Sequence, residues 1–120
     1  MWDKITGMGG INHYMLPLWN GQGLASPKYG NIAIVKLIDK MKSFGSRSEN
    51  LTAKIFGGGE VIQAHSIHYN IGQRNIDLAR SMLAELNIPI IASNTGGKAG
   101  RKILFNTQTG EVQHKFINAQ

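Results

Sequence analysis

His13 is the residue of this chain whose type and surroundings most favour chemistry. It lies in the segment Gly9 to Pro17, among glycines and large apolar side chains. Histidine changes its charge near neutral pH, so it can take a proton from a reacting group as a general base. The neighbouring glycines let a substrate chain approach the backbone closely. The alternative is a core histidine with a satisfied hydrogen bond, and the segment alone leaves both open.

The other histidines favour chemistry less. His65 and His68 are three residues apart, a spacing that brings two imidazoles together on a helical turn. Zinc needs further ligands and no cysteine is present to supply them, so exposed loop histidines are the expectation and no metal site is predicted. His114 falls in the last predicted strand and is expected to face solvent.

The sequence contains no cysteine. This excludes disulfides, thiolate zinc sites and a cysteine nucleophile within these residues. Any covalent chemistry that needs a thiol therefore lacks its nucleophile in the chain as printed.

Two glycine-rich stretches superficially resemble phosphate-binding loops. Thr95 to Lys102 contains Gly-Gly-Lys, but Ala99 follows the lysine and a strand is predicted next, unlike the nucleotide-binding loop that opens a helix. A tight turn that carries cations beside a cleft is expected. Gly57 to Gly59 lacks a supporting lysine and is expected to be a turn that brings backbone close to neighbouring strands.

Composition and charge set the broad class. The chain has 120 residues, 42% of them hydrophobic, which favours one domain over residues 1–120. Its net charge of +6 suits an acidic partner or a solvated basic surface, and the basic residues are scattered, which favours the second. No apolar run approaches the roughly 20 residues of a membrane span, and no signal peptide is evident. A cytoplasmic protein without membrane insertion is expected.

Hydrophobic periodicity predicts the elements that must position these residues. Helices of period 3.6 are expected over Tyr29–Phe44, ended by Gly45, and over Gly72–Leu86, capped by Asn87 before Pro89. The fold class predicted is α+β, with layered β-sheets flanked by helices and a largely antiparallel sheet. The remaining elements expected are a strand or strand pair Ile5–Leu16 ended by Pro17, a strand Leu51–Phe56, a loop Glu60–Ile71, a strand Ile88–Ala92, and a hairpin of Lys102–Phe105 and Glu111–Ile117.

In their order along the chain, several motifs resemble those of one family, the CheD chemoreceptor glutamine deamidases. Any one of them is weak evidence, whereas the ordered set is specific and covers essentially the whole chain. The motifs are Gly9-Gly10-Ile11-Asn12-His13-Tyr14-Met15-Leu16-Pro17, Tyr29-Gly30-Asn31, Ala53-Lys54-Ile55-Phe56-Gly57-Gly58, Ile71-Gly72-Gln73-Arg74-Asn75, Ile88-Pro89-Ile90, Gly96-Gly97 and Gly100-Arg101-Lys102.

The resemblance implies an activity and a fold. The family hydrolyses glutamine side-chain amides on methyl-accepting chemotaxis receptors to glutamates and ammonia. A cysteine thiolate attacks the carboxamide carbon, a histidine activates the thiol and protonates the departing ammonia, and a hydroxyl residue orients the histidine. No metal or organic cofactor is used. The implied partners are chemoreceptors as substrates and CheC-type phosphatases, and the implied fold is a CheD-like α/β sandwich.

Only the histidine carries over from the family's catalytic residues, onto His13. The family's cysteine lies on a strand before that histidine, and counting back from His13 passes the start of the printed chain. The expectation is a domain incomplete at its N-terminus, with truncation favoured over a natural short form. Such a chain is expected to be inactive by itself.

Two further hypotheses belong to other functional classes. The first is a non-catalytic binding module that docks CheC-type phosphatases or chemoreceptors. The second is a nucleic-acid binder, which only the net charge of +6 suggests and which salt-sensitive binding would reveal. No nucleic-acid partner is expected.

Overall fold

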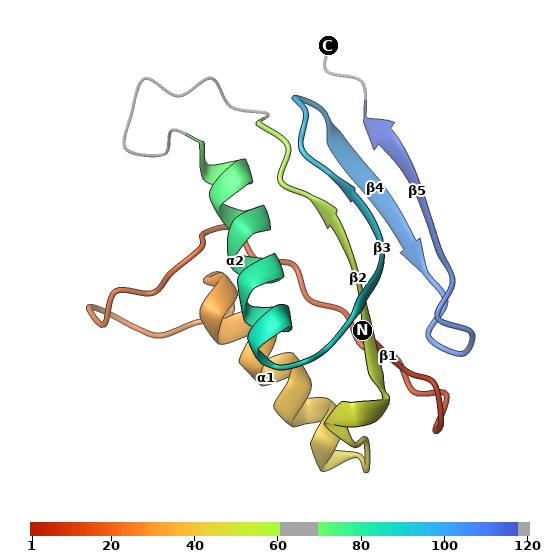
Figure 1. Cartoon of the computed structure of the whole chain (residues 1–120). Helices are drawn as coiled ribbons and strands as arrows, with labels where there is room; N and C mark the ends of the chain where they lie inside the picture. Colours follow the sequence, from red (N-terminus) through yellow and green to blue (C-terminus); the bar gives the residue numbers. More distant parts are fainter. Residues whose placement is uncertain (61–69, 118–120) are drawn as a thin grey trace.

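A computed structural model describes residues 1–60 and 70–117 of the chain. The loop predicted over Glu60–Ile71 falls largely outside the described residues, as do His65 and His68. Figure 1 shows both helices and strands, which alternate until the last two strands, and this confirms the mixed α and β class. The elements are β1 (Trp2–Asp3), α1 (Gly30–Ser43), a short 3₁₀ turn (Ser48–Asn50), β2 (Leu51–Gly57), α2 (Ile71–Glu85), β3 (Ile90–Thr95), β4 (Gly100–Phe105) and β5 (Val112–Ile117).

The strands form two sheets in the described part of the chain. One has the order β1-β2-β3, and the other is the antiparallel hairpin β4-β5. β1 pairs antiparallel with β2, but β2 and β3 run parallel from Ala53 opposite Ile90 to Gly57 opposite Thr95. The expectation of a largely antiparallel sheet is therefore wrong for this central pair. Helix α2 lies between β2 and β3 in the chain and carries it back across the sheet, which makes a parallel pair possible.

Both predicted helices are confirmed to within one residue at each end. Gly45 follows α1 with a φ of 103°, and Asn87 follows α2 with a φ of 57°. These left-handed residues end the helices as expected, since they turn the chain while the last carbonyls still accept hydrogen bonds. Lys40 and Lys42 lie in the last turn of α1, where positive charge favours the helix dipole.

The core lies between the two helices and β2. Figure 1 shows α1 and α2 side by side on one side of β2 and β3, with the β4-β5 hairpin on the other. Burying such side chains drives folding at about 25 cal/mol per Å² of apolar surface. The central residues are Ile34, Ile38, Met41, Leu51, Ala53, Ala79, Leu83 and Ile88.

The predicted strand over Ile5–Leu16 is wrong. The backbone N–H groups of Ile5 and Thr6 donate to the Asp3 carboxylate, and Gly7 has a φ of 71°, so the chain turns sharply directly after β1. Beyond this turn only isolated bridges form, Trp2 with Gly9 and Leu16 with Tyr29. A strand needs a continuous ladder of partners, and the described residues offer none along this segment.

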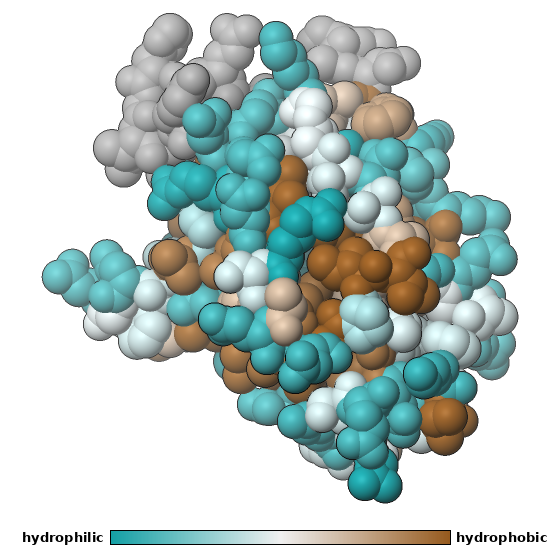
Figure 2. All heavy atoms as spheres, in the orientation of Figure 1, coloured by the Kyte–Doolittle hydropathy of each residue, from teal (hydrophilic) through white to brown (hydrophobic). Residues whose placement is uncertain are grey.

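The other strands differ from prediction mainly at their ends. β3 begins at Ile90 rather than Ile88, because its pairing with β2 starts there opposite Ala53, and it extends to Thr95 opposite Gly57. The hairpin is confirmed, with β4 beginning at Gly100. Figure 2 shows hydrophobic side chains at the surface near the centre of one face, surrounded by hydrophilic ones. Neither described helix is long and apolar enough to cross a membrane.

Candidate functional site

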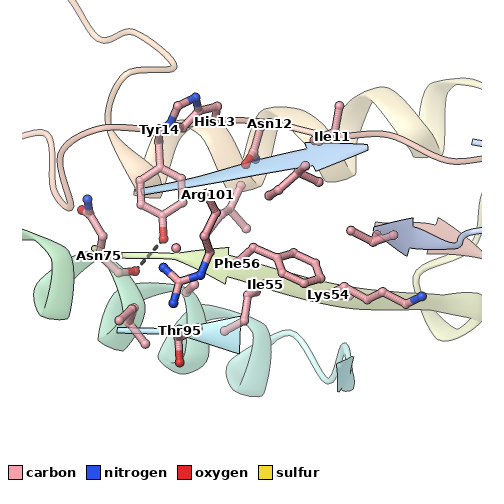
Figure 3. Close-up of a pocket in the computed structure, with 18 of the residues that line it drawn as sticks. Ile11, Asn12, His13, Tyr14, Lys54, Ile55, Phe56, Asn75, Thr95 and Arg101 are labelled. Carbon is pink, nitrogen blue, oxygen red and sulfur yellow. Dashed lines mark hydrogen bonds between the residues drawn. The ribbon is translucent and has the colours of Figure 1, made fainter. Parts of the chain in front are cut away.

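His13 lies on an extended segment, Ile11 to Leu16, whose side chains alternate between two sides. Ile11, His13 and Met15 are exposed, whereas Asn12, Tyr14 and Leu16 are half-buried. Figure 3 shows the imidazole of His13 on the opposite side of the segment from the ring of Tyr14. The exposure of His13 contradicts the alternative of a buried core histidine, and its role as a base stays a prediction.

The segment is held at both ends by backbone hydrogen bonds. Upstream, the N–H of Gly10 donates to the carbonyl of Met1 at 2.9 Å. Downstream, the N–H groups of Met15 and Leu16 both donate to the carbonyl of Lys28, at 2.8 and 2.9 Å. His13 thus lies near the middle of a short span between two anchored ends.

Tyr14 and Asn75 connect this span to helix α2. The Tyr14 hydroxyl donates to the backbone carbonyl of Asn75 at 2.6 Å, and the Asn75 side-chain amide donates to the carbonyl of Met15 at 3.0 Å. Burial raises the pKa of Tyr14 to about 12, so its hydroxyl stays protonated and able to donate at neutral pH. Figure 3 shows the hydroxyl pointing from the segment toward α2.

The N-terminus of α2 is fixed against the end of β2. A Cβ added to Gly72 would lie 2.1 Å from the carbonyl oxygen of Gly58, so the two backbones pass too closely for any side chain. The Glu60 carboxylate accepts the N–H of Gln73 at 3.0 Å, which satisfies one of the free donors in the first helical turn. The glycines at 57–59, expected to approach neighbouring strands, thus bring Gly58 against a helix.

A groove of about 1110 Å³ lies beside the segment. Its walls come from the 11–16 segment, β2, the start of α2, and the inward-facing side chains of β4, which alternate along that strand as Arg101, Ile103 and Phe105. Figure 3 shows Arg101 reaching from β4 toward Tyr14 and Asn75. A groove of this volume and apolar lining is large enough to hold a polypeptide side chain or an extended segment.

Arg101 is one of the cationic residues that line this groove, with Lys28 and Lys54. Its Nε donates to the Asn94 side-chain oxygen at 2.6 Å and its Nη2 to the carbonyl of Gly96 at 2.9 Å. The guanidinium also lies 4.9 Å from the centre of the Phe116 ring. These contacts hold the turn between β3 and β4, which agrees with the predicted tight turn carrying cations beside a cleft.

The sequence pointed to the motifs that contain Asn75 and Arg101 without assigning either residue a role. The contacts of Asn75 join it to Tyr14 and Met15, 61 and 60 positions away, and those of Arg101 depend on how the turn between β3 and β4 folds, so periodicity reveals neither. His114 is exposed as expected and packs between the rings of Phe56 and Phe116, with ring centres 5.4 and 6.1 Å away. Within the described ranges, no group of three or more His, Cys, Asp or Glu side chains is placed to hold a metal ion.

Comparison with known proteins assigns a family to this arrangement. Residues 15–116 match the family model described as CheD chemotactic sensory transduction, a match that begins just after His13 and Tyr14. The chain is similar to a probable chemoreceptor glutamine deamidase CheD of Trichlorobacter lovleyi, with 50% identity over 112 residues, 93% of this chain and 70% of that protein.

Two further relatives have the same printed description. The protein of Sulfurimonas denitrificans is 43% identical over 118 residues, which cover 98% of this chain and 76% of that protein. The protein of a Janthinobacterium species is 40% identical over 119 residues, 96% of this chain and 58% of that protein.

Proposed function

The chain belongs to the CheD family, and from this we propose that it serves in the hydrolysis of glutamine side-chain amides on chemoreceptors, with His13 as general base. The observation that carries the proposal is the 50% identity to a relative described as a probable chemoreceptor glutamine deamidase. The exposure of His13 beside the groove supports its role, because a general base must reach the substrate.

The chemistry divides between a thiol and the histidine. A thiolate attacks the carboxamide carbon, and the imidazolium formed when the histidine takes the thiol proton gives that proton to the leaving ammonia. Water then attacks the thioester, with the histidine as base, to release glutamate and regenerate the thiol. Of these parts the 120 residues contain the histidine but no cysteine. We therefore propose that they supply the base and the groove beside its segment, and do not deamidate by themselves.

A chimeric protein tests this proposal. In it, this chain replaces the segment of the Trichlorobacter lovleyi relative with which it aligns. The rest of that relative is kept. Incubated with purified chemoreceptor, the chimera is expected to release ammonia and to convert receptor glutamine to glutamate. The 120-residue chain alone is expected to release none. Ammonia release from the chain alone would contradict the division of roles, and an inactive but folded chimera would contradict the function.

Docking without chemistry is the second candidate, and one observation favours it. Four large apolar side chains on and after the His13 segment are strongly exposed: Ile11 at 61%, Met15 at 66%, Leu18 at 59% and Leu24 at 86%. Such a surface is typical of a protein-binding site. A CheC-type phosphatase or a chemoreceptor is the proposed partner. A cytoplasmic location for the chain stays a prediction.

A pull-down with the purified chain tests the docking candidate. Docking would be supported if the chain retains a CheC-type phosphatase or receptor and if Met15→Asp abolishes this retention. Val35→Asp, which changes an exposed apolar residue of helix α1, is the control. A folded chain that retains neither partner would reject it.

A further inference from the structure

We propose that Asn75 is a positioning residue for His13, acting through the two residues that follow the histidine in the chain. The inference rests on the proposed role of His13 as general base. Asn75 lies in the first turns of α2 and His13 in the extended segment before α1, so the two belong to different parts of the sequence.

The contact consists of two hydrogen bonds in opposite directions. Tyr14 donates its hydroxyl proton to the backbone carbonyl of Asn75, and the Asn75 side chain donates to the backbone carbonyl of Met15. The second bond strengthens the hold on the Met15–Leu16 peptide, whose N–H already donates to the Lys28 carbonyl, and the first fixes where the Tyr14 side chain points. Together they hold a side chain and an adjacent peptide of the segment to a single helical residue.

Little else holds the middle of the segment. Within residues 1–60 and 70–117, no backbone–backbone hydrogen bond involves Ile11, Asn12, His13 or Tyr14. Successive side chains in an extended segment point to opposite sides, so holding Tyr14 toward α2 holds His13 toward solvent. Without the Asn75 contacts, only the packing of the Tyr14 ring against the core would hold the span between Gly10 and Met15, and the imidazole would move more widely with it.

The surroundings of Tyr14 and Asn75 favour one geometry. Gly30 makes room for the tyrosine ring, since a Cβ there would lie 2.7 Å from it. Ile76, next to Asn75, is buried, and the close approach of Gly72 to Gly58 fixes the turn of α2 that precedes it. Asn75 is therefore a rigid reference point to which the His13 segment is attached.

Such positioning matters for a general base because catalysis depends steeply on geometry. A displacement of about 1 Å caused by a change remote from the chemistry can cost on the order of a hundredfold in rate. The base must lie within hydrogen-bonding distance of the proton that it takes.

Backbone relaxation by NMR on the full 120-residue chain tests the proposal without requiring activity. In the wild type, the amides of Asn12 and His13 are expected to have order parameters of about 0.85, typical of a rigid backbone. In Tyr14→Phe, which removes the bond to the Asn75 carbonyl, and in Asn75→Ala, which removes the bond to the Met15 carbonyl, they are expected to fall, and in the double variant to fall below about 0.6. Gln73→Ala changes an exposed residue of the same helical turn and is expected to leave them unchanged.

A purely stabilising role predicts a different outcome. Both variants would then lower the free energy of unfolding in urea while the order parameters of Asn12 and His13 stay at the wild-type value, and this result would overturn the proposal. If Asn75→Ala does not fold, Tyr14→Phe decides, since it removes one oxygen atom and keeps the ring. If the order parameters fall but His13 proves dispensable in the chimera, the positioning stands and the proposed function fails.

Discussion

At the scale of single residues, the sequence alone makes His13 a candidate base but does not reveal the contacts that hold its segment. A histidine among glycines and apolar side chains is a local feature, visible in nine consecutive residues, Gly9 to Pro17. The bond from Tyr14 to Asn75 joins residues 61 positions apart and exists only because α2 packs beside the segment. Side-chain-to-backbone contacts of this kind have no periodic signature, so they follow from the tertiary arrangement alone.

Tyr14 gives a direct spectroscopic prediction. Because burial raises its pKa to about 12, above the usual value of about 10, its contribution to stability is present below about pH 10 and is lost as the pH rises from about 10 to 12. A phenolate absorbance titration of the folded chain is expected to show one of its three tyrosines ionising near pH 12. That step is expected to be absent in Tyr14→Phe. Its persistence in the variant would assign the high pKa to another tyrosine.

Asp3 gives the corresponding prediction in acid. Its side chain is buried, and hydrogen bonds from the backbone N–H of Thr6 and, less strongly, Ile5 lower its pKa to about 2 against the opposing effect of burial. Because an unfolded aspartate titrates near about 3.9, the stability from this carboxylate is present above about pH 4 and is lost as the pH falls to about 2.

Urea unfolding measured at several pH values checks the Asp3 prediction. The free energy of unfolding of the wild type is expected to fall across this window more steeply than that of Asp3→Asn, which has no carboxylate to protonate. Identical slopes for the two proteins would contradict the role given to Asp3.

At the scale of elements, the helices and the strands from Leu51 onward followed from periodicity, and the strand predicted over Ile5–Leu16 did not form. An amphipathic helix satisfies its own backbone, so its apolar stripe is enough to predict it. A strand needs a partner along its whole length, which a sequence window does not contain. The segment Ile5–Leu16 has the apolar residues of a strand, but the turn at Gly7 and the missing ladder leave it extended and only partly paired.

The junction of β2 and α2 gives a prediction in which two physical effects oppose each other. Alanine in a helix is favoured over glycine by about 1 kcal/mol, so propensity alone predicts that Gly72→Ala stabilises the protein. The added Cβ would lie 2.1 Å from the Gly58 oxygen, and relieving such a clash costs about 1–3 kcal/mol or more. We expect the clash to exceed the propensity gain because the neighbour is backbone.

Thermal and urea unfolding measure the sign of the Gly72→Ala effect. Ser81→Ala, an exposed substitution on the same helix, controls for propensity and is expected to be neutral or slightly stabilising. A Gly72→Ala protein more stable than wild type would show that α2 can move away from β2, and Asn75 would then lose its place as a fixed reference.

At the scale of the whole molecule, the fold class was predictable and the groove was not. The alternation of helices and strands indicates a mixed α and β fold whatever the order of the strands. The parallel pairing of β2 with β3 and the space of about 1110 Å³ between the sheets depend on how the layers are placed, which composition does not encode. The family motifs supplied what periodicity could not, since they identified the functional class from an ordered set of short segments.

The central claim is that His13 is the base these residues supply, and kinetics of the chimera test it most directly. Chemoreceptor deamidation is measured with His13→Ala and, as a matched control, with His114→Ala, which removes the exposed histidine of β5. The account predicts that His13→Ala lowers kcat by about 10²–10⁴-fold while His114→Ala leaves kcat within about twofold of the parent chimera. Equal rates for the parent chimera and a folded His13→Ala variant would contradict it.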